Sequence, residues 1–257
     1  MRHQNKGLID RDVSLNFQFN GKPFKGFKGD TLASALLANN QILVGRSFKY
    51  HRPRGVMTAG SEEPNALVTV KRAGSLEPNT RATVQPLYEG LIAQSQNAWP
   101  TLRYDLLSIN NYLSPFLAAG FYYKTFMWPR AFWEMLYEPL IRRAAGLGSL
   151  GLDFNNDLYE KAFAHCDVLI IGAGPSGLMA AWTAAHAGLD VILVDENNRA
   201  GGRLLSEVEE VGGKFGYVWA SDIIKDLQAL PNVNIMMNTT VTGAYDQGTY
   251  GALERVG

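Results

Sequence analysis

The chain has 257 residues, is 46% hydrophobic and carries a formal net charge of zero. A chain of this length and composition can bury one or two hydrophobic cores, which argues against disorder and favours two domains. The balanced charge excludes a global electrostatic attraction to nucleic acid or to an anionic membrane.

The chain contains one cysteine, Cys166, which excludes an internal disulfide framework and any site built from four cysteines. A reducing, cytoplasmic setting is therefore expected. The first twenty residues lack the continuous apolar core of a secretory signal. The most apolar tract, residues 114–141, is interrupted by charged residues and prolines, so we expect no membrane span.

The N-terminal residues predict a small sheet followed by a helix. Residues 14–19 alternate in polarity, and Asn20-Gly21 separates them from a second short run at residues 22–27. Asn-Gly is the strongest hairpin signal. Residues 31–40 then repeat apolar side chains at helical spacing, with Asp30 as the expected N-cap.

Two further strands are expected at residues 66–70 and 81–84. A hairpin, a helix and later strands indicate a β-grasp domain, which is also the fold of plant-type ferredoxins. The iron–sulfur cluster loop of a ferredoxin would fall near residues 44–55, where this chain has no cysteine.

A connector rich in aromatic residues follows, and its prolines predict short helices separated by turns. Two interpretations of its apolar surface stay open: packing between the two domains, or docking against another subunit. Residues 146–151, GLGSLG, are typical of a flexible joint. The predicted boundaries are 1–98 for the β-grasp domain, 99–165 for the connector and 166–257 for an incomplete second domain.

The second domain begins with a dinucleotide-binding pattern. A short apolar strand at residues 167–171 leads directly into Gly172, Gly174 and Gly177. The first glycine suits a tight turn, the second allows close approach of a pyrophosphate, and the third allows the helix to pack on the strand. Pro175 is placed where the first turn of a helix tolerates proline. The backbone amides of that helix start would face the pyrophosphate.

A second strand ends in Asp195 and Glu196, at the spacing where an acid accepts hydrogen bonds from the ribose hydroxyls. An acid there repels a 2′-phosphate, so NAD or FAD is favoured over NADP. Arg203 follows Gly202, and two roles stay open for its side chain: contact with a phosphate, or exposure to solvent. A helix at residues 218–230 precedes a third strand, and Val241 in the next strand is expected near the adenine.

No group of residues looks catalytic, and none has the spacing of a metal site. Cys166 is expected to be a small buried residue, and the acid pairs Glu62-Glu63 and Glu209-Glu210 to be solvated loop residues. A basic and aromatic loop leaves three interpretations open: a solvated loop, a subunit or flavin-phosphate contact, or a nucleic-acid surface. Its cationic side chains are Arg46, Lys49, His51, Arg52 and Arg54.

Five stretches, RSFKYHRPRG, GSEEPNALV, VLIIGAGPSGLMAA, VILVDEN and GGRLL, together resemble the α subunit of heterotetrameric sarcosine oxidase. The resemblance runs from about residue 14 to the end, and the first two stretches make it more specific than a Rossmann motif alone. It implies a ferredoxin-like domain without its cluster, followed by a domain that binds NAD noncovalently, with FAD as the alternative. The implied cofactor contacts are Gly172, Ala173, Gly174, Pro175, Ser176, Gly177, Asp195, Glu196, Asn197, Gly202, Arg203, Leu204 and Val241.

The resemblance also implies a multi-subunit oxidoreductase acting on CH–NH donors. In that family sarcosine, tetrahydrofolate and oxygen give glycine, methylene-tetrahydrofolate and hydrogen peroxide. An FMN lies at a subunit interface there, and a C-terminal region absent from this sequence binds tetrahydrofolate. We therefore expect other oxidase subunits as partners, no nucleic acid or membrane partner, no metal and no catalytic residue in this part, which would be inactive alone.

Overall fold

The computed structural model describes residues 2, 7–72, 75–117, 119–120, 126–144 and 158–255. The chain divides into two compact units, Met1–Leu158 and Tyr159–Gly257. The proposed joint at residues 146–151 lies outside the described residues. Within the described ranges, no helix is both long and apolar enough to cross a bilayer.

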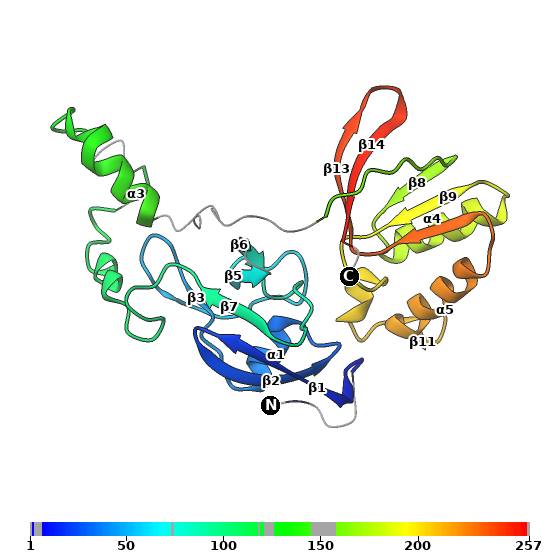
Figure 1. The fold of residues 1–257 in the computed structure, drawn as a ribbon, viewed down its shortest axis with the longest axis horizontal. Helices are drawn as coiled ribbons and strands as arrows, with labels where there is room; N and C mark the ends of the chain where they lie inside the picture. Colours follow the sequence, from blue (N-terminus) through cyan, green and yellow to red (C-terminus); the bar gives the residue numbers. More distant parts are fainter. Residues whose placement is uncertain are drawn as a thin grey trace. The chain divides into compact units, whose positions relative to one another are not determined.

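The first unit is built on a mixed five-stranded sheet with the order β2-β1-β7-β5-β6 (Figure 1). Strand β1 pairs antiparallel with β2 and parallel with β7, and β5 pairs antiparallel with both β6 and β7. The strands are β1 (Asp10–Phe19), β2 (Lys22–Lys28), β5 (Leu67–Arg72), β6 (Ser75–Arg81) and β7 (Leu91–Ser95), and the helix is α1 (Leu32–Ala38).

The core of this unit forms between α1 and the sheet. Leu32 and Leu36 of the helix are fully buried with Phe17, Val68 and Leu91 of the strands. The alternation in β1 therefore places its apolar residues on the face toward the helix, as a period of two requires. The expected hairpin is confirmed: Asn20 and Gly21 have φ of 50° and 73°, which suits a type I′ turn.

Two local predictions in this unit were wrong. Thr31, not Asp30, is the N-cap of α1, and it forms a capping box with Ser34. The buried Asp30 carboxylate instead accepts from the Phe27 amide and the Ser34 hydroxyl. Of the strand expected at residues 81–84, Arg81 ends β6 and residues 82–84 form a turn, because the amides of residues 84 and 85 donate to the Arg81 carbonyl. The edge strand β6 tolerates its internal proline, and β7 was not anticipated.

The loop between α1 and β5 is organised around Glu63, whose side chain is expected from the sequence to be solvated. That expectation was wrong, since Glu63 is only 1% exposed. One carboxylate oxygen accepts from the amides of Met57 (2.7 Å) and Thr58 (2.6 Å), and the other accepts from those of Asn65 (2.7 Å) and Ala66 (3.1 Å). Burial raises the pKa of Glu63, but these hydrogen bonds together hold it below its usual 4.5.

This pKa shift predicts acid sensitivity of the first unit. A carboxyl group whose pKa is depressed by folding contributes stability above its unfolded pKa, and that contribution is lost as the pH falls through the folded pKa. We expect the free energy of unfolding of the first unit to decrease as the pH is lowered below about 4.5. Urea unfolding at a series of pH values would test this, and Glu63→Gln should flatten the dependence. Equal pH slopes in the two proteins would contradict the assignment.

The connector is attached to the first unit by short elements. A two-stranded ladder, β3 (Gly45–Arg46) and β4 (Pro53–Arg54), closes the loop after α1. The connector itself contains the 3₁₀ helix η1 (Leu106–Asn111), the π-helical η2 (Trp133–Tyr137) and α3 (Glu138–Ala144), in agreement with the expected short helices.

The second unit has a parallel three-stranded sheet with the order β12-β9-β8 (Figure 1). Its strands are β8 (Val168–Ile171), β9 (Val191–Val194) and β12 (Val233–Met236), with helices α4 (Pro175–His186) and α5 (Gly216–Gln228). Buried residues of β9 and α4 form its core. The remaining elements are η3 (Gly202–Leu205), β10 (Glu210–Val211), β11 (Lys214–Phe215), β13 (Thr239–Tyr245), η4 (Asp246–Gly248) and β14 (Thr249–Glu254).

Candidate dinucleotide site

The glycine turn joins β8 to α4 in the arrangement expected from the sequence. Gly172 has φ of 101°, which favours glycine, and Gly174 is the N-cap of α4 with Pro175 at its first turn. A Cβ built on Gly177 would lie 1.9 Å from the carbonyl oxygen of Gly172, so only glycine allows this approach of helix and turn. A Cβ on Gly174 would meet no atom within 4 Å, so space is open above the helix start.

Three of the residues expected to contact the cofactor are hydrogen-bonded to one another. Asp195 follows the end of β9 and is 8% exposed. Its carboxylate accepts from the amide of Ala173 at 2.6 Å and from the amide of Asn197 at 2.8 Å. The Ala173 amide is therefore turned toward Asp195, whereas the neighbouring Glu196 is exposed. The Asp195 carboxylate at the end of β9 thus stabilises the glycine turn by accepting from the Ala173 amide.

A second pair of glycines packs against this turn. The Gly201 amide donates to the Ala173 carbonyl at 2.8 Å, and a Cβ on Gly202 would lie 3.1 Å from the Gly174 Cα. The Arg203 side chain is 83% exposed and pairs with Glu207 at 2.8 Å. Leu204 is buried, next to Gly216 at the start of α5.

The remaining predicted residues lie at different depths around the same turn. Ser176 is exposed in the first turn of α4, where helix amides lack intrahelical acceptors. The carbonyl of Asn197 accepts from the Asn238 amide, which links the end of β9 to the chain before β13. Val241 lies in β13 and is half-buried. The turn, Asp195 and the second glycine pair are joined by hydrogen bonds, whereas Val241 lies in the two-stranded sheet of β13 and β14.

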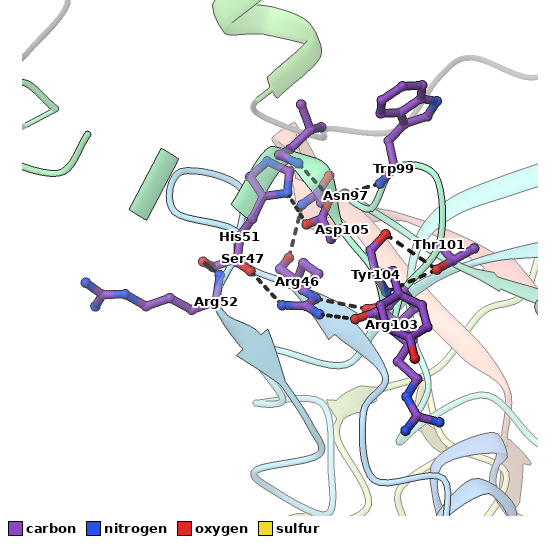
Figure 2. Close-up of polar contacts among 12 residues, drawn as sticks. Arg46, Ser47, His51, Arg52, Asn97, Trp99, Thr101, Arg103, Tyr104 and Asp105 are labelled. Atoms are coloured by element: carbon purple, nitrogen blue, oxygen red, sulfur yellow. Dashed lines mark hydrogen bonds and ion pairs between the residues drawn. The ribbon is translucent and has the colours of Figure 1, made fainter. Parts of the chain in front are cut away.

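The basic and aromatic loop of the first unit is a bonded structure rather than a uniformly solvated patch (Figure 2). The Arg46 guanidinium donates to the carbonyls of Leu102 (3.0 Å), Arg103 (3.1 Å) and His51 (3.1 Å). His51 is 1% exposed, and its Nδ1 lies 2.7 Å from the carboxylate of Asp105.

The hydrogen bond between His51 and Asp105 resembles that of a catalytic acid–histidine pair, but the His51 ring is buried and a substrate could not reach it. The second ring nitrogen of His51 is buried and has no hydrogen-bond partner among the described residues. A general base must reach its substrate, so we assign this pair a structural role. Sequence inspection gave no signal for it, because 54 positions separate the two residues.

The described ranges contain no group of three or more His, Cys, Asp or Glu side chains placed to bind a metal ion. Ferredoxin-type clusters require four thiolates, and the whole sequence contains only Cys166. The residues of the first unit therefore do not fit such a cluster.

The fold and the glycine turn define a chain with a ferredoxin-like domain followed by a Rossmann-like dinucleotide-binding domain. Two family models agree with this class: residues 12–98 match a "2Fe-2S iron-sulfur cluster binding domain", and residues 170–239 match an "NAD(P)-binding Rossmann-like domain".

The chain is homologous to the N-terminal quarter of sarcosine oxidase subunit alpha. It is 60% identical to that subunit from Rhizobium meliloti over 98% of this chain and 25% of the relative. The subunit alpha of a Corynebacterium species is 33% identical over 96% of this chain and 21% of the relative. The chain thus spans about a quarter of the length of the curated relatives it matches.

A solved structure shares the fold. The crystal structure of L-proline dehydrogenase from P. horikoshii aligns with 98% of this chain and 38% of its own, with a TM-score of 0.54 and 19% sequence identity.

Proposed function

We propose that this chain is the NAD-binding N-terminal part of the α subunit of an amine oxidase similar to sarcosine oxidase. The observation that carries the proposal is the open space above Gly174, next to a helix start that Gly177 brings against the turn. The 60% identity to a sarcosine oxidase subunit alpha supports the assignment of the complete protein as an oxidoreductase acting on CH–NH donors.

The residues around the turn would each hold a different part of the dinucleotide. First-turn amides of α4, including those of Ser176 and Gly177, would donate to the pyrophosphate, assisted by the helix dipole. Glu196 is exposed, and we assign it the ribose hydroxyls, while the bonded Asp195 positions the Ala173 segment. Val241 would border the adenine. Bound NAD is a hydride carrier, and these residues would hold its ADP portion.

Three contacts implied by the resemblance take different roles in this proposal. The buried Leu204 would support the turn by packing on α5 rather than touch the cofactor. Arg203, ion-paired with Glu207, would lie at the rim of the site. Gly202 would provide close backbone packing on Gly174, and Asn197 would hold the Asp195 carboxylate.

We place the oxidation chemistry outside this part of the protein. The proposed complete reaction converts sarcosine, tetrahydrofolate and oxygen to glycine, methylene-tetrahydrofolate and hydrogen peroxide. Other subunits, with FMN at an interface, and a C-terminal folate-binding region would supply the reactive groups. On this proposal, residues 1–98 and 99–165 form a cluster-free domain and its connector, residues 166–257 hold NAD, and the complex is cytoplasmic.

Cofactor analysis of the full-length protein tests the proposal. After acid extraction, NAD should be released from the purified protein, and calorimetric titration of stripped protein should give NAD binding at least about tenfold tighter than NADP binding. If FAD were the only dinucleotide bound, and mutation of the glycine turn removed it, a flavin-dependent dehydrogenase would be favoured instead. Intact subunit assembly without any dinucleotide affinity would favour a non-enzymatic assembly module.

A further inference from the structure

The loop after α1 includes residues 44–55, where the sequence comparison with plant-type ferredoxins places the cluster loop, and it contains no thiolate. Residues 44–66 include no cysteine, and Cys166 lies outside the matched range of 12–98. Because the residues do not fit a four-thiolate cluster, the hydrogen bonds that order this loop have to come from the protein's own groups.

The Glu63 carboxylate is placed to do this. Four backbone amides from both sides of the loop, at residues 57, 58, 65 and 66, converge on its two oxygens, and the Thr58 hydroxyl adds a contact of 3.3 Å. Amides that converge on one buried anion are also how proteins surround iron–sulfur clusters, whose sulfurs accept hydrogen bonds. An internal carboxylate can therefore accept the amide hydrogen bonds of such a loop without iron.

The other arm of the loop reaches the connector. Besides Arg46 and His51, the hydroxyl of Tyr50 donates to the Leu117 carbonyl at 3.0 Å, and Arg52 Nε donates to the Asn111 side chain at 3.0 Å. Asp105 accepts from His51 and also from the amides of Trp99 (3.0 Å) and Leu107 (3.2 Å). Four side chains of one loop, at residues 46, 50, 51 and 52, thus contact one segment, residues 99–117.

The loop tip also carries backbone strain. His51 has φ of 53°, a left-handed conformation that costs free energy for a residue with a Cβ. Such a conformation persists where the surroundings determine it, and here the His51 amide, carbonyl and ring are all bonded. The left-handed conformation therefore lies at His51, one of the four loop residues that contact the connector.

We propose that residues 44–66 form an internal clamp that holds connector residues 99–117, ordered by the Glu63 carboxylate in place of an iron–sulfur cluster. This inference goes beyond the proposed NAD site and does not depend on it. The clamp assigns the loop an intramolecular partner, and its cations Arg46 and Arg52 are used in binding that partner rather than nucleic acid.

Iron analysis and hydrogen exchange on the full-length protein test both halves of the proposal. Iron should be far below one atom per chain, and a strong chelator should leave the melting temperature unchanged. Glu63→Gln replaces one acceptor oxygen by a donor and should lower the melting temperature by about 10 °C. Glu63→Asp, which keeps the charge, should recover part of this loss. Stoichiometric iron, or an unchanged melting temperature in Glu63→Gln, would overturn the proposal.

Arg46→Ala tests the clamp even if the Glu63 variants fail to fold. Amides in residues 99–107 should exchange at least about tenfold faster in Arg46→Ala, while those of the central strands β1 and β7 keep their protection. Arg54→Ala removes an exposed cation from the same loop and serves as the matched control. Equal exchange of residues 99–107 in Arg46→Ala, Arg54→Ala and the unmodified protein would refute the clamp.

Discussion

Gly177→Ala is expected to weaken NAD binding strongly and to destabilise the second unit, because its Cβ would lie 1.9 Å from the Gly172 carbonyl oxygen. The obstructing atom belongs to the backbone, so no side-chain rotation can relieve the clash. Either α4 moves away from the turn or the turn loses its shape. We expect a loss of about 3 kcal/mol in unfolding free energy and at least about 100-fold in NAD affinity. Urea unfolding and calorimetric titration measure the two effects.

Gly174→Ala is the matched variant that separates binding from folding. Gly174 has φ of −72° and ψ of −179°, which an alanine can adopt, and its Cβ would meet no protein atom within 4 Å. We expect an unchanged melting temperature together with NAD affinity reduced by about tenfold or more, since the methyl group would occupy the proposed pyrophosphate position. Unimpaired NAD binding in Gly174→Ala would place the cofactor elsewhere.

Asp195→Ala is expected to produce the second large effect. It should lower the stability of the second unit and, as a consequence, its affinity for NAD. Removing this carboxylate leaves the buried Ala173 amide and the Asn197 amide without their acceptors. Unsatisfied buried donors cost about 1–3 kcal/mol each, so we expect the second unit to lose about 3 kcal/mol. NAD affinity should fall because the unbraced turn no longer presents the first-turn amides of α4 in one arrangement.

Glu196→Ala provides the comparison, because its exposed side chain can be removed with little effect on folding. We expect an unchanged melting temperature, NAD affinity lowered by about tenfold, and a smaller preference for NAD over NADP. Thermal unfolding and titration with both nucleotides give the readouts. If Asp195→Ala kept full stability while Glu196→Ala kept full NAD affinity, the assigned roles of the two acids would be wrong.

Local sequence signals predicted those elements whose causes are also local. The turn at Asn20-Gly21, β8 with its glycines, and helix α4 follow from conformations that few residues other than these adopt. The helix start at Thr31 was missed by one position, because Asp30 and Thr31 are both good N-caps and tertiary contacts determine which side chain is free to cap.

The roles of polar residues were harder to predict, because their partners are distant in the sequence. Glu63 resembles a solvated acid until four loop amides surround it, and Arg46 resembles a surface cation until the carbonyls of residues 102 and 103 approach. Asp195 occupies the expected position, but its bond to Ala173 forms across 22 residues. Such bonds depend on how loops return to the sheet, which propensity and periodicity do not encode.

The amino-acid sequence by itself determined the two fold classes, the glycine turn and the absence of the thiolates a cluster needs. Only the tertiary structure decided that Glu63 orders a loop, that His51 and Arg46 hold the connector, and that Asp195 braces the turn while Glu196 remains exposed. The physical reason is that backbone conformation is set by neighbouring residues, whereas the burial and pairing of a charge depend on segments that folding brings together.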